Sequence, residues 1–446
     1  MNITLINPPP EQAIEYWDKP NFPNVNLAYL AGYLEKKGII CSIIDAKLER
    51  LSNIQIIERC KDADLVGITS LTHEIHLSTN LADEIKKAYP KVKMVIGGVH
   101  STALPRETME EFKAFDYLIY GDGEETFFEL IEALKNNKRL DKIRGLVFKK
   151  DNNIIINSPR EFLQDLDYMP AWHLFPLDLA KECFIITSRG CPSNCNFCMH
   201  MHGHKIRYRD VENVMSEIDL LVNKYNIKYI YFADETFTLN KLRIKEICDK
   251  IINRKIYFKW SAETRVTCVD LEVLKKMKAA GCHLIRFGIE SGNPEILKAS
   301  KKGITLEQVK YAVNLAKEAG LDTEGMFILG HPNETRETMK DTINFATKLN
   351  TTSVAFGIMT PYPKTEIFDI AKRGEGGYKL ISTDWKDYNK QIGNALEFTN
   401  IPRKEIEKIQ FLGYMKFYFY NFKIKEIFQK FIFNYRLIFS MIKKVI

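Results

Sequence analysis

The stretch 187-TSRGCPSNCNFCMHMHGH-204 decides how the second half of this chain is organised, because it gathers metal-ligating side chains directly after a strand-like run. Its cysteines follow the spacing Cys-x3-Cys-x2-Cys, at Cys191, Cys195 and Cys198. Three histidines follow at alternate positions, His200, His202 and His204. The apolar run 183-CFIITS-188 predicts a strand, so the ligand-rich segment lies on the loop that leaves its carboxyl end.

This cysteine loop admits several kinds of site. A disulfide needs an oxidising compartment, which nothing in the sequence indicates. A zinc site needs a fourth ligand, which any of the three histidines is able to supply. A ferredoxin-type cluster needs a fourth cysteine, but Cys183 and Cys248 are not at ligand spacing. Three soft thiolates also suit a four-iron cluster with one open iron, so zinc and iron–sulfur stay as alternatives at this point.

Residues 1–136 alternate short apolar runs with amphipathic stretches of helical period, such as 26-NLAYLAGYLEKKG-38 and 77-LSTNLADEIKKAYP-90. The apolar runs are 2-NITLINP-8, 39-IICSIIDA-46, 64-DLVGITSL-71, 93-KMVIGGVH-100 and 116-DYLIYGDG-123. Strands at this spacing need crossover helices, so we expect an α/β, Rossmann-like (flavodoxin-like) parallel sheet. Ligands of such sheets bind at the carboxyl ends of the strands. Glycines there let a planar ligand approach the backbone, although tight turns explain them equally well.

Residues 183–363 form a second β/α series, with polar residues at the strand ends. Its predicted strands are 183-CFIITS-188, 227-IKYIYFA-233, 257-YFKWSAE-263, 283-HLIRFGIE-290, 323-TEGMFILG-330 and 353-SVAFGIM-359. Six units are too few for an eight-stranded barrel, so we expect a partial (β/α)6 TIM-type barrel. Between the two series, 145-GLVFKKDNNIIINSP-159 predicts a hairpin that turns at Asp151-Asn152-Asn153.

These patterns divide the chain into four predicted parts. They are a Rossmann-like domain at 1–137, a linker with a hairpin at 138–182, the partial barrel at 183–365 and a helical extension at 366–446. The N-terminus, MNITLINPPP, resembles a buried strand rather than a signal peptide, and no long uncharged apolar run occurs. We therefore expect a cytoplasmic protein with reduced cysteines.

The net charge of +7 is concentrated at one end of the chain. Residues 411–446 hold seven Lys or Arg against one acid, Glu426, together with twelve Phe or Tyr. The remainder is near neutral, which argues against nucleic acid as a partner of the whole protein. A basic, aromatic tail of this kind favours contact with a membrane surface or an amphiphile, or a helical cap that closes the open edge of the barrel.

The cysteine loop, with Phe197 before its third cysteine, resembles the signature of the radical S-adenosylmethionine (radical SAM) superfamily. Further segments match in order: 232-FADETFT-238, 260-WSAETRV-266, 287-FGIESGNPEIL-297, 327-FILGHPNET-335 and 361-PYPKTEIF-368, the last with Lys364 where glycine is commoner. Near the N-terminus, 96-IGGVHSTALP-105 and 120-YGDGEETFFEL-130 resemble the cobalamin-binding domain that precedes the radical SAM domain in one large class. The resemblance covers about residues 1–400.

This resemblance implies that the three cysteines hold a 4Fe-4S cluster whose open iron binds S-adenosylmethionine (SAM). An electron from the cluster then cleaves SAM to a 5′-deoxyadenosyl radical, which abstracts a hydrogen atom from the substrate. The implied SAM contacts are Phe197, Ala233, Asp234, Glu235, Glu263, Glu290 and Ser291, with Glu263 at the position of the acid that contacts ribose. The strand-end acids are also able to pair with Lys or Arg, such as Arg265 or Arg286.

For cobalamin, the resemblance implies contacts at the strand ends of the N-terminal sheet. They are Thr69, Ser70, Gly97, Gly98, His100, Gly121, Gly123 and Glu124. The motif Asp-x-His-x-x-Gly, whose histidine ligates cobalt in domains of the methionine-synthase type, is absent: 72-THEIHLS-78 has His73 and His76 without the Asp and Gly. These two histidines or His100 are left either as substitutes for that ligand or as surface residues.

The function predicted from these motifs is cobalamin-dependent radical SAM methylation of an unactivated carbon. Alternatives are cyclisation, carbon–carbon coupling or another rearrangement of a lipid or tetrapyrrole-like substrate, and a non-enzymatic Cys3His zinc protein. The expected partners are a small-molecule or lipid-like substrate and a reductant such as ferredoxin or flavodoxin. No catalytic side chain is assigned by the sequence, and His200, His202 and His204 have no predicted role.

Overall fold

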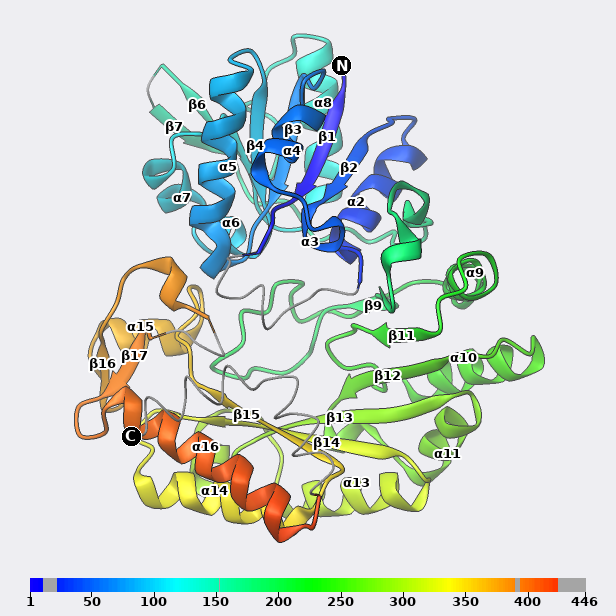
Figure 1. Cartoon of the computed structure of the whole chain (residues 1–446), viewed down its shortest axis with the longest axis vertical. Helices are drawn as coiled ribbons and strands as arrows, with labels where there is room; N and C mark the ends of the chain where they lie inside the picture. The colour runs from blue at the N-terminus through cyan, green and yellow to red at the C-terminus, as the bar shows by residue number, and fades with distance from the viewer. Residues whose placement is uncertain (11–21, 152, 390–393, 424–446) are drawn as a thin grey trace. The chain divides into compact units, whose positions relative to one another are not determined.

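The computed structural model describes residues 1–10, 22–151, 153–389 and 394–423 (Figure 1). The chain divides into two compact units, Met1–Pro192 with His200–Tyr231, and Ser193–Met199 with Phe232–Ile446. Both units are built of parallel strands and helices, so the α/β prediction is confirmed. The middle of the cysteine loop belongs to the second unit, while both of its ends belong to the first.

The first unit contains a seven-stranded sheet of order β2-β1-β3-β4-β5-β6-β7. Its strands are β1 (Ile3–Asn7), β2 (Ser42–Asp45), β3 (Leu65–Thr69), β4 (Lys93–Gly97), β5 (Tyr117–Ile119), β6 (Leu146–Lys150) and β7 (Asn153–Ile156). β1 to β5 are parallel, and all five residues of β1 are buried, as expected for a strand covered on both faces. The predicted hairpin adds β6 and β7 as an antiparallel extension beside β5.

Helices cover this sheet on both faces (Figure 1). They are α2 (Val25–Lys36), α3 (Ala46–Glu49), α4 (Asn53–Arg59), α5 (Ile75–Ala88), α6 (Val99–Ala103), α7 (Pro105–Glu111) and α8 (Gly123–Lys135). α2 packs beside α8 and α4 packs beside α5, which is the doubly wound arrangement that right-handed crossovers produce. The carboxyl ends of β1 to β5 therefore meet at one edge of the sheet, where the loops with the predicted cobalamin contacts begin.

Short elements connect the first sheet to the second. They are the 3-10 turns η1 (Thr72–Glu74), η2 (Trp172–Leu174) and η3 (Leu177–Leu179), the strands β8 (Cys183–Ile185), β9 (Ser188–Arg189), β10 (Arg207–Tyr208) and β11 (Tyr229–Phe232), α9 (Val211–Asp219) and the π turn η4 (Leu220–Lys224). The N-terminus of α9 is capped by Asp210, whose side chain accepts from the backbone N–H groups of Glu212 and Asn213.

The second sheet has six strands in the order β15-β14-β13-β12-β11-β8. The strands not yet given are β12 (Lys259–Thr264), β13 (Cys282–Glu290), β14 (Asp322–Leu329) and β15 (Ser353–Ile358), and consecutive members of this set pair in parallel. Six strands with helices between them, four of which (β12 to β15) are parallel neighbours, make the predicted partial barrel. The register of β13 against β14 shifts between Gly288 and Glu290, so the end of β13 carries a bulge.

The helices of the second unit are α10 (Lys241–Asn253), α11 (Leu271–Ala279), α12 (Pro294–Ala299), α13 (Leu306–Glu318), α14 (Arg336–Leu349), α15 (Glu366–Lys372) and α16 (Arg403–Tyr420). Two short turns, η5 (Val266–Cys268) and η6 (Trp385–Asp387), accompany them. Capping boxes start α13 at Thr305 and α14 at Thr335, so local sequence fixes where both helices begin.

The C-terminal extension, predicted as helical, also contains an antiparallel pair, β16 (Tyr378–Leu380) with β17 (Leu396–Phe398). Tyr378 and Phe398 are buried and pack on the ends of β14 and β15, so these strands serve as part of the barrel core. α16 packs beside α14 and β15. Among the residues that the structure describes, no helix has the length and apolar character needed to cross a membrane.

Candidate cofactor site

The cysteine loop begins and ends on a short antiparallel ladder, in which Arg189 of β9 lies opposite Arg207 of β10. The backbone N–H of Cys191 donates to the carbonyl oxygen of Gly203 at 3.0 Å, which joins the two arms of the loop. Gly190 has a φ of 102°, and a Cβ at this position would lie 2.4 Å from the carbonyl oxygen of Lys205. Only glycine fits this crossing, so the path of the chain into Cys191 is fixed.

The middle of the loop is held by Asn196, a buried residue of the second unit. Its backbone N–H donates to the carbonyl of Ser300 at 3.2 Å, and its Nδ2 donates to the carbonyl of Ala299 at 3.1 Å. The Asn196 carbonyl accepts from the backbone N–H of Ile367 at 3.2 Å. Through its backbone and side chain, this one residue therefore joins the end of α12 to the start of α15, with Cys195 and Cys198 on either side of it in the sequence.

Cys195 is buried beside two cations, whereas Cys198 is exposed. The Nη1 of Arg265 lies 4.0 Å from the Cys195 Sγ, and the Nη2 of Arg265 donates to the carbonyl of Lys302. Burial raises the pKa of the Cys195 thiol, and the nearby Lys302 and Arg265 oppose this shift. A metal deprotonates a coordinating thiol outright, and both cations would then stabilise the thiolate.

The donor set of the loop fits an iron–sulfur cluster, because three thiolates are soft ligands. The histidines have other neighbours: the Nδ1 of His202 lies 3.0 Å from the Oδ1 of Asp122, and the rings of His200 and His204 lie 4.5 Å apart. In the described part of the chain, no three His, Cys, Asp or Glu side chains are already arranged around a common metal position. We therefore assign cluster binding from the identity and spacing of the donors.

Glu290 ends β13 in a left-handed conformation, with a φ of 71°. Its Oε1 accepts from the Nζ of Lys302 at 2.8 Å, and both side chains are about 90% buried. A Cβ on Gly288 would lie 2.7 Å from each of these two atoms, so the glycine leaves the space that the ion pair fills. The sequence offered a Lys or Arg partner for the strand-end acids, and the partner of Glu290 is Lys302.

Glu263, predicted to contact ribose, lies on β12 with a half-buried side chain. Its carbonyl accepts from the backbone N–H of Phe237 at 3.0 Å, which ties β12 to the turn after β11. Among the described residues, the Glu263 carboxylate makes no ion pair or hydrogen bond with another side chain. It is therefore available to a ligand in a way that Glu290 is not.

The other predicted SAM contacts lie at two strand ends. Ala233, Asp234 and Glu235 follow β11, where Asp234 is buried and Glu235 is exposed. Ser291 is fully buried, and its Oγ lies 3.1 Å from the Oγ1 of Thr342 on α14. The backbone N–H of Asn293 also donates to the Ser291 Oγ at 3.1 Å, so this side chain is used to start α12.

The turn after β14 contains a buried acid that the sequence did not single out. The Oε2 of Glu334 accepts from the backbone N–H groups of Gly330 at 2.6 Å and His331 at 2.9 Å. Burial raises the pKa of Glu334 to about 7, although these two N–H donors favour its charged form. The ring of His331 lies edge-on to that of Phe197, with centroids 6.0 Å apart. Burial lowers the pKa of His331 to about 4, so the imidazole that lines Phe197 is neutral at pH 7.

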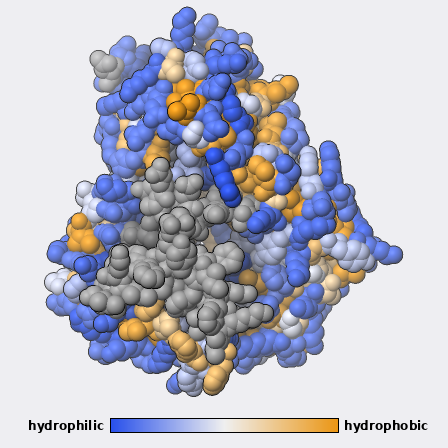
Figure 2. All heavy atoms as spheres, in the orientation of Figure 1, coloured by the Kyte–Doolittle hydropathy of each residue, from blue (hydrophilic) through white to orange (hydrophobic). Residues whose placement is uncertain are grey.

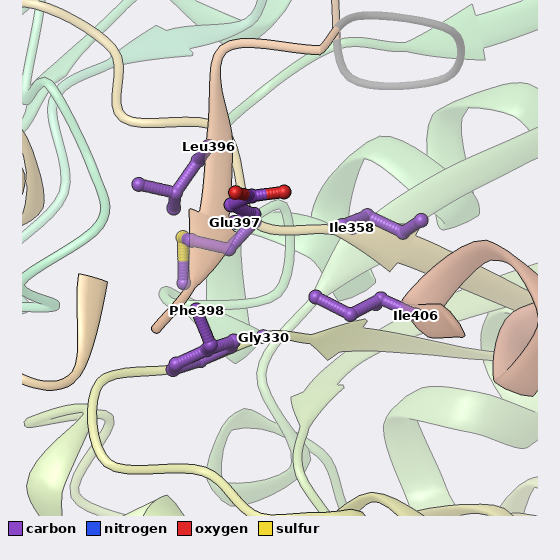
Figure 3. Close-up of a pocket in the computed structure, with 7 residues that line it drawn as sticks. Gly330, Ile358, Leu396, Glu397, Phe398 and Ile406 are labelled. Carbon is purple, nitrogen blue, oxygen red and sulfur yellow. The ribbon is translucent and has the colours of Figure 1, made fainter. Parts of the chain in front are cut away.

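A small apolar gap opens where the C-terminal extension covers the ends of β14 and β15 (Figure 3). Its lining includes Gly330, Ile358, Leu396, Phe398 and Ile406, and its empty volume is about 160 Å3. Pockets for ligands usually exceed about 300 Å3. We therefore interpret this gap as a space left between the packed side chains of the C-terminal extension and the barrel, and we do not assign SAM binding to it.

At the edge of the first sheet, two kinds of glycine are present among the predicted cobalamin contacts. Gly98 has a φ of 101°, and its Cβ would lie 2.8 Å from the carbonyl oxygen of Ser70. This glycine is required by the close approach of the β3 and β4 ends. Among the described residues, no atom lies within 4 Å of a Cβ added at Gly97 or Gly121, so that part of the chain leaves the backbone there uncovered. These two positions fit the approach of a large planar ligand, and Thr69, at the end of β3, lies opposite Gly97.

His100 is buried, 1% exposed, in α6. Burial, reinforced by the neighbouring His76, lowers its pKa to about 4. Both imidazoles lie edge-on to the ring of Phe112, at 5.5 Å for His76 and 6.3 Å for His100. A neutral imidazole is the form that binds metal, but this pair is packed among apolar residues of the domain, and we assign no cobalt ligand to it.

The acidic side chains of the segment after β5 bind other side chains of the protein. The Glu124 Oε1 accepts from the Nη2 of Arg189 at 2.6 Å and from the Tyr168 hydroxyl at 2.9 Å. The neighbouring Asp122 is surrounded by Arg189, Arg207 and His202. Gly123 starts α8 between them. The sequence placed Glu124 at a cobalamin contact, whereas the structure shows its carboxylate bound to Arg189 and Tyr168.

Comparisons with known proteins match two separate segments of the chain to two families. The family model described as the radical SAM superfamily matches residues 185–346, and the B12 binding domain matches residues 19–131. The chain is 37% identical over 441 residues to an uncharacterized methyltransferase of Pyrococcus horikoshii, across 96% of this chain and 95% of that protein. It is 30% identical over 389 residues to the anaerobic magnesium-protoporphyrin IX monomethyl ester cyclase of Rubrivivax gelatinosus, across 83% of this chain and 69% of the cyclase.

Among solved structures, the radical SAM methyltransferase TsrM of Kitasatospora setae, with cobalamin and a 4Fe-4S cluster bound, has a similar fold. The TM-score is 0.73 at 19% identity, over 88% of this chain and 83% of that one. At this identity the likeness concerns the fold, and it covers both the Rossmann-like sheet and the partial barrel.

Proposed function

Because the chain belongs to the cobalamin-dependent radical SAM enzymes, we propose that it transfers a methyl group from SAM to an unactivated carbon of a small or lipid-like molecule. The predicted resemblance and the predicted cofactors, a 4Fe-4S cluster, SAM and cobalamin, are confirmed by this membership. It also removes the non-enzymatic zinc protein from the alternatives. The observation that carries the methyl-transfer proposal is the 37% identity, along almost the whole length of both chains, to a protein described as a methyltransferase.

When bound, the cluster would supply the electron that cleaves one SAM molecule to methionine and the radical, a second SAM would supply the methyl group and leave as S-adenosylhomocysteine, and cobalamin would carry that methyl group. Cys191, Cys195 and Cys198 hold the cluster. The Glu263 carboxylate, which has no partner among the described side chains, accepts hydrogen bonds from the ribose hydroxyls of SAM. Lys302 neutralises Glu290, so this buried pair offers a fixed dipole rather than a bare charge. Phe197 and the neutral His331 form an apolar wall that excludes water.

For the Rossmann-like domain, we assign the approach of cobalamin to the open backbone at Gly97 and Gly121, beside Thr69. Ser70 and Gly98 shape that edge through their backbone contact, and His100 lies behind it in the core. We place Gly123 and Glu124 at the boundary of the site, because Glu124 binds Arg189.

The test is an anaerobic reaction with SAM labelled in its methyl group, in which products are followed by mass spectrometry. Methyl transfer predicts S-adenosylhomocysteine and 5′-deoxyadenosine together, and a labelled product in a cell extract. Cys198→Ala should abolish both SAM-derived products, whereas the matched control Cys248→Ala, a buried cysteine of α10, should retain them. Formation of both products by Cys198→Ala would contradict the radical SAM assignment.

A second function, oxidative cyclisation of a tetrapyrrole-like ring, is favoured by the 30% identity to the cyclase of Rubrivivax gelatinosus. The same reaction separates the two functions. Cyclisation predicts 5′-deoxyadenosine without S-adenosylhomocysteine, and this outcome would refute methyl transfer.

We also propose that α16 and the residues after it bring the enzyme to a lipid surface. Its exposed large apolar side chains are Leu412, Phe419 and Tyr420, and Phe422 follows at 87% exposure. Figure 2 shows orange side chains at the lower edge of the visible face, where Figure 1 places α16. The basic and aromatic residues 424–446 lie outside the described residues, so the tail prediction extends beyond the structure. Flotation with anionic vesicles tests it: full-length Phe419→Ser, Phe422→Ser protein should float less than the unsubstituted protein.

A further inference from the structure

Five polar side chains from three separate segments of the sequence meet near the end of β5. The Asp122 Oδ2 lies 2.6 Å from the Nη1 of Arg207, and its Oδ1 lies 3.0 Å from the Nδ1 of His202 and 3.7 Å from the Nη1 of Arg189. The Arg189 Nη2 continues to Glu124 at 2.6 Å. We call Asp122, Glu124, Arg189, Arg207 and His202 the Asp122 cluster. All five belong to the first unit.

Three residues of the Asp122 cluster lie in the segments that flank the cysteine loop. Arg189 precedes Cys191 by two residues, on the arm that enters the cysteine loop. His202 and Arg207 lie on the arm that returns from it, after Cys198. The Asp122 carboxylate therefore contacts both arms of the loop that carries the three cysteines assigned to the iron–sulfur cluster.

The Asp122 cluster is built as a rigid support. The side chains of Asp122, Arg189 and Arg207 are between 3% and 7% exposed, and His202 is 32% exposed. Arg207 is fixed twice more, through the carbonyls of Leu163 at 2.6 Å and His202 at 3.1 Å. The Asp122 Oδ2 also accepts from the backbone N–H of Leu163 at 3.0 Å. Two buried guanidinium groups against two buried carboxylates balance in charge, so the loss of one carboxylate would leave a buried cation without compensation.

We propose that Asp122 is the positioning residue of the iron–sulfur loop, and that it fixes Cys191 and the return of the chain after Cys198 from the last parallel strand of the cobalamin-binding domain. Asp122 does not touch the cluster; it acts through Arg189, Arg207 and His202. His202, which has no role in the sequence prediction, becomes the third contact of this carboxylate rather than a metal ligand. The inference rests on the cluster that the proposed function requires.

Groups that orient metal-binding segments typically change metal affinity by roughly tenfold or more when they are removed. Asp122→Asn keeps the size of the side chain and one carbonyl acceptor but removes the charge. After anaerobic reconstitution of the full-length protein, we expect this variant to lose iron to a chelator roughly tenfold faster than the unsubstituted protein. The electron paramagnetic resonance spectrum of its reduced cluster should be broadened or shifted, because Cys191 is no longer held in one place.

Glu74→Gln is the matched control. It breaks another buried ion pair of the same unit, between Lys47 and Glu74, which does not involve the cysteine loop. This variant should lose thermal stability but release iron at the unsubstituted rate and keep the same spectrum. The proposal would be overturned if Asp122→Asn released iron at the same rate as the unsubstituted protein. It would also be overturned if Glu74→Gln released iron as fast as Asp122→Asn.

A second pair of variants tests the proposal if Asp122→Asn does not fold. His202→Gln retains an amide N–H donor for Asp122 and should hold iron as the unsubstituted protein does, whereas His202→Phe should release it faster. If both variants release iron at the same rate, the His202 contact has no positioning role and the proposal fails. Absence of iron from the unsubstituted protein itself would count against the proposed function, and so the two failures are distinguishable.

Discussion

Arg265 sets the electrostatic environment of the buried cluster cysteine, and its removal should lower the reduction potential of the cluster. The Nη1 of Arg265 lies 4.0 Å from the Sγ of Cys195, while Nη2 is anchored on the carbonyl of Lys302. A fixed positive charge at this distance stabilises the more negative, reduced state of the cluster. Hydrogen bonds to the sulfur atoms and local charge are the factors by which proteins tune such clusters.

The magnitude follows from the distance. Two unit charges 4.0 Å apart interact by about 4 kcal/mol when the effective dielectric constant is about 20. The added electron is shared over the cluster and only one corner lies near Arg265, so we take about a third of this energy, or about 1.4 kcal/mol. For a one-electron couple this corresponds to a shift of about 60 mV. Arg265→Gln should therefore make the potential about 60 mV more negative, and Arg265→Lys should recover part of the shift.

The assay is a potentiometric titration followed by electron paramagnetic resonance, without SAM, so that changes in SAM binding do not enter. Arg286→Gln is the control, because it also removes a cation from a barrel strand, but one that lies 3.4 Å from Glu324 and donates to Ser261. Its potential should match that of the unsubstituted protein. A potential for Arg265→Gln that is unchanged or more positive would refute the electrostatic reasoning.

Three further predictions concern stability and cofactor binding. Lys302→Met leaves Glu290 buried without a partner and should lower the free energy of unfolding, measured by denaturant titration, by roughly 3–5 kcal/mol. Adding Glu290→Gln to this variant should recover much of the lost free energy of unfolding. No recovery would contradict the ion-pair account. Protonated Glu334 is favoured in the folded state, so its stabilisation is complete below its ordinary pKa of 4.5 and is lost as the pH rises through about 7. The unfolding free energy of Glu334→Gln relative to the unsubstituted protein should therefore rise by about 3 kcal/mol over this range, and a flat difference would show that the carboxyl has an ordinary pKa. Gly97→Val should weaken cobalamin binding, measured by absorbance, without lowering the melting temperature. Gly98→Ala should lower the melting temperature, because its Cβ meets the Ser70 carbonyl at 2.8 Å. Unchanged cobalamin affinity in Gly97→Val would remove Gly97 from the site.

The sheet architecture was predictable because it depends on periodicity and order. The predicted apolar runs contain all five parallel strands of the first sheet and overlap all six strands of the second, where β12, β13 and β14 each extend one residue beyond the run. Lys364 was recognised as standing where glycine is commoner, and its φ of 67° gives the reason, since that conformation costs a non-glycine residue free energy. The β6–β7 hairpin was also predicted, but nothing in its sequence says that it extends the first sheet beside β5.

The partners of the charged residues were not predictable in the same way. Arg207 and Asp122 are 85 residues apart, and Arg189 and Glu124 are 65 apart. No period connects residues at such separations, and only the tertiary fold brings them together. Likewise, the bulge between Gly288 and Glu290 turns the Glu290 side chain toward Lys302, and a one-residue irregularity of this kind leaves no mark in the hydrophobic pattern.

The use of carboxylates at strand ends explains which of the predicted contacts remain available to cofactors. Two of the predicted contact acids, one in each unit, are neutralised by cations of the same unit: Glu290 by Lys302, and Glu124 by Arg189. A buried carboxylate committed to such a pair cannot turn to a ligand without leaving its cation unpaired in a medium of low dielectric. The Glu263 carboxylate forms no ion pair with another described residue and is only half buried, so a ligand can bind it without breaking an existing interaction. The resemblance implies ligand contacts for all three acids and matches Glu263 to the acid that contacts ribose. The pairing of charges separates Glu263, which we propose to bind ligand, from Glu290 and Glu124, which are held in buried ion pairs.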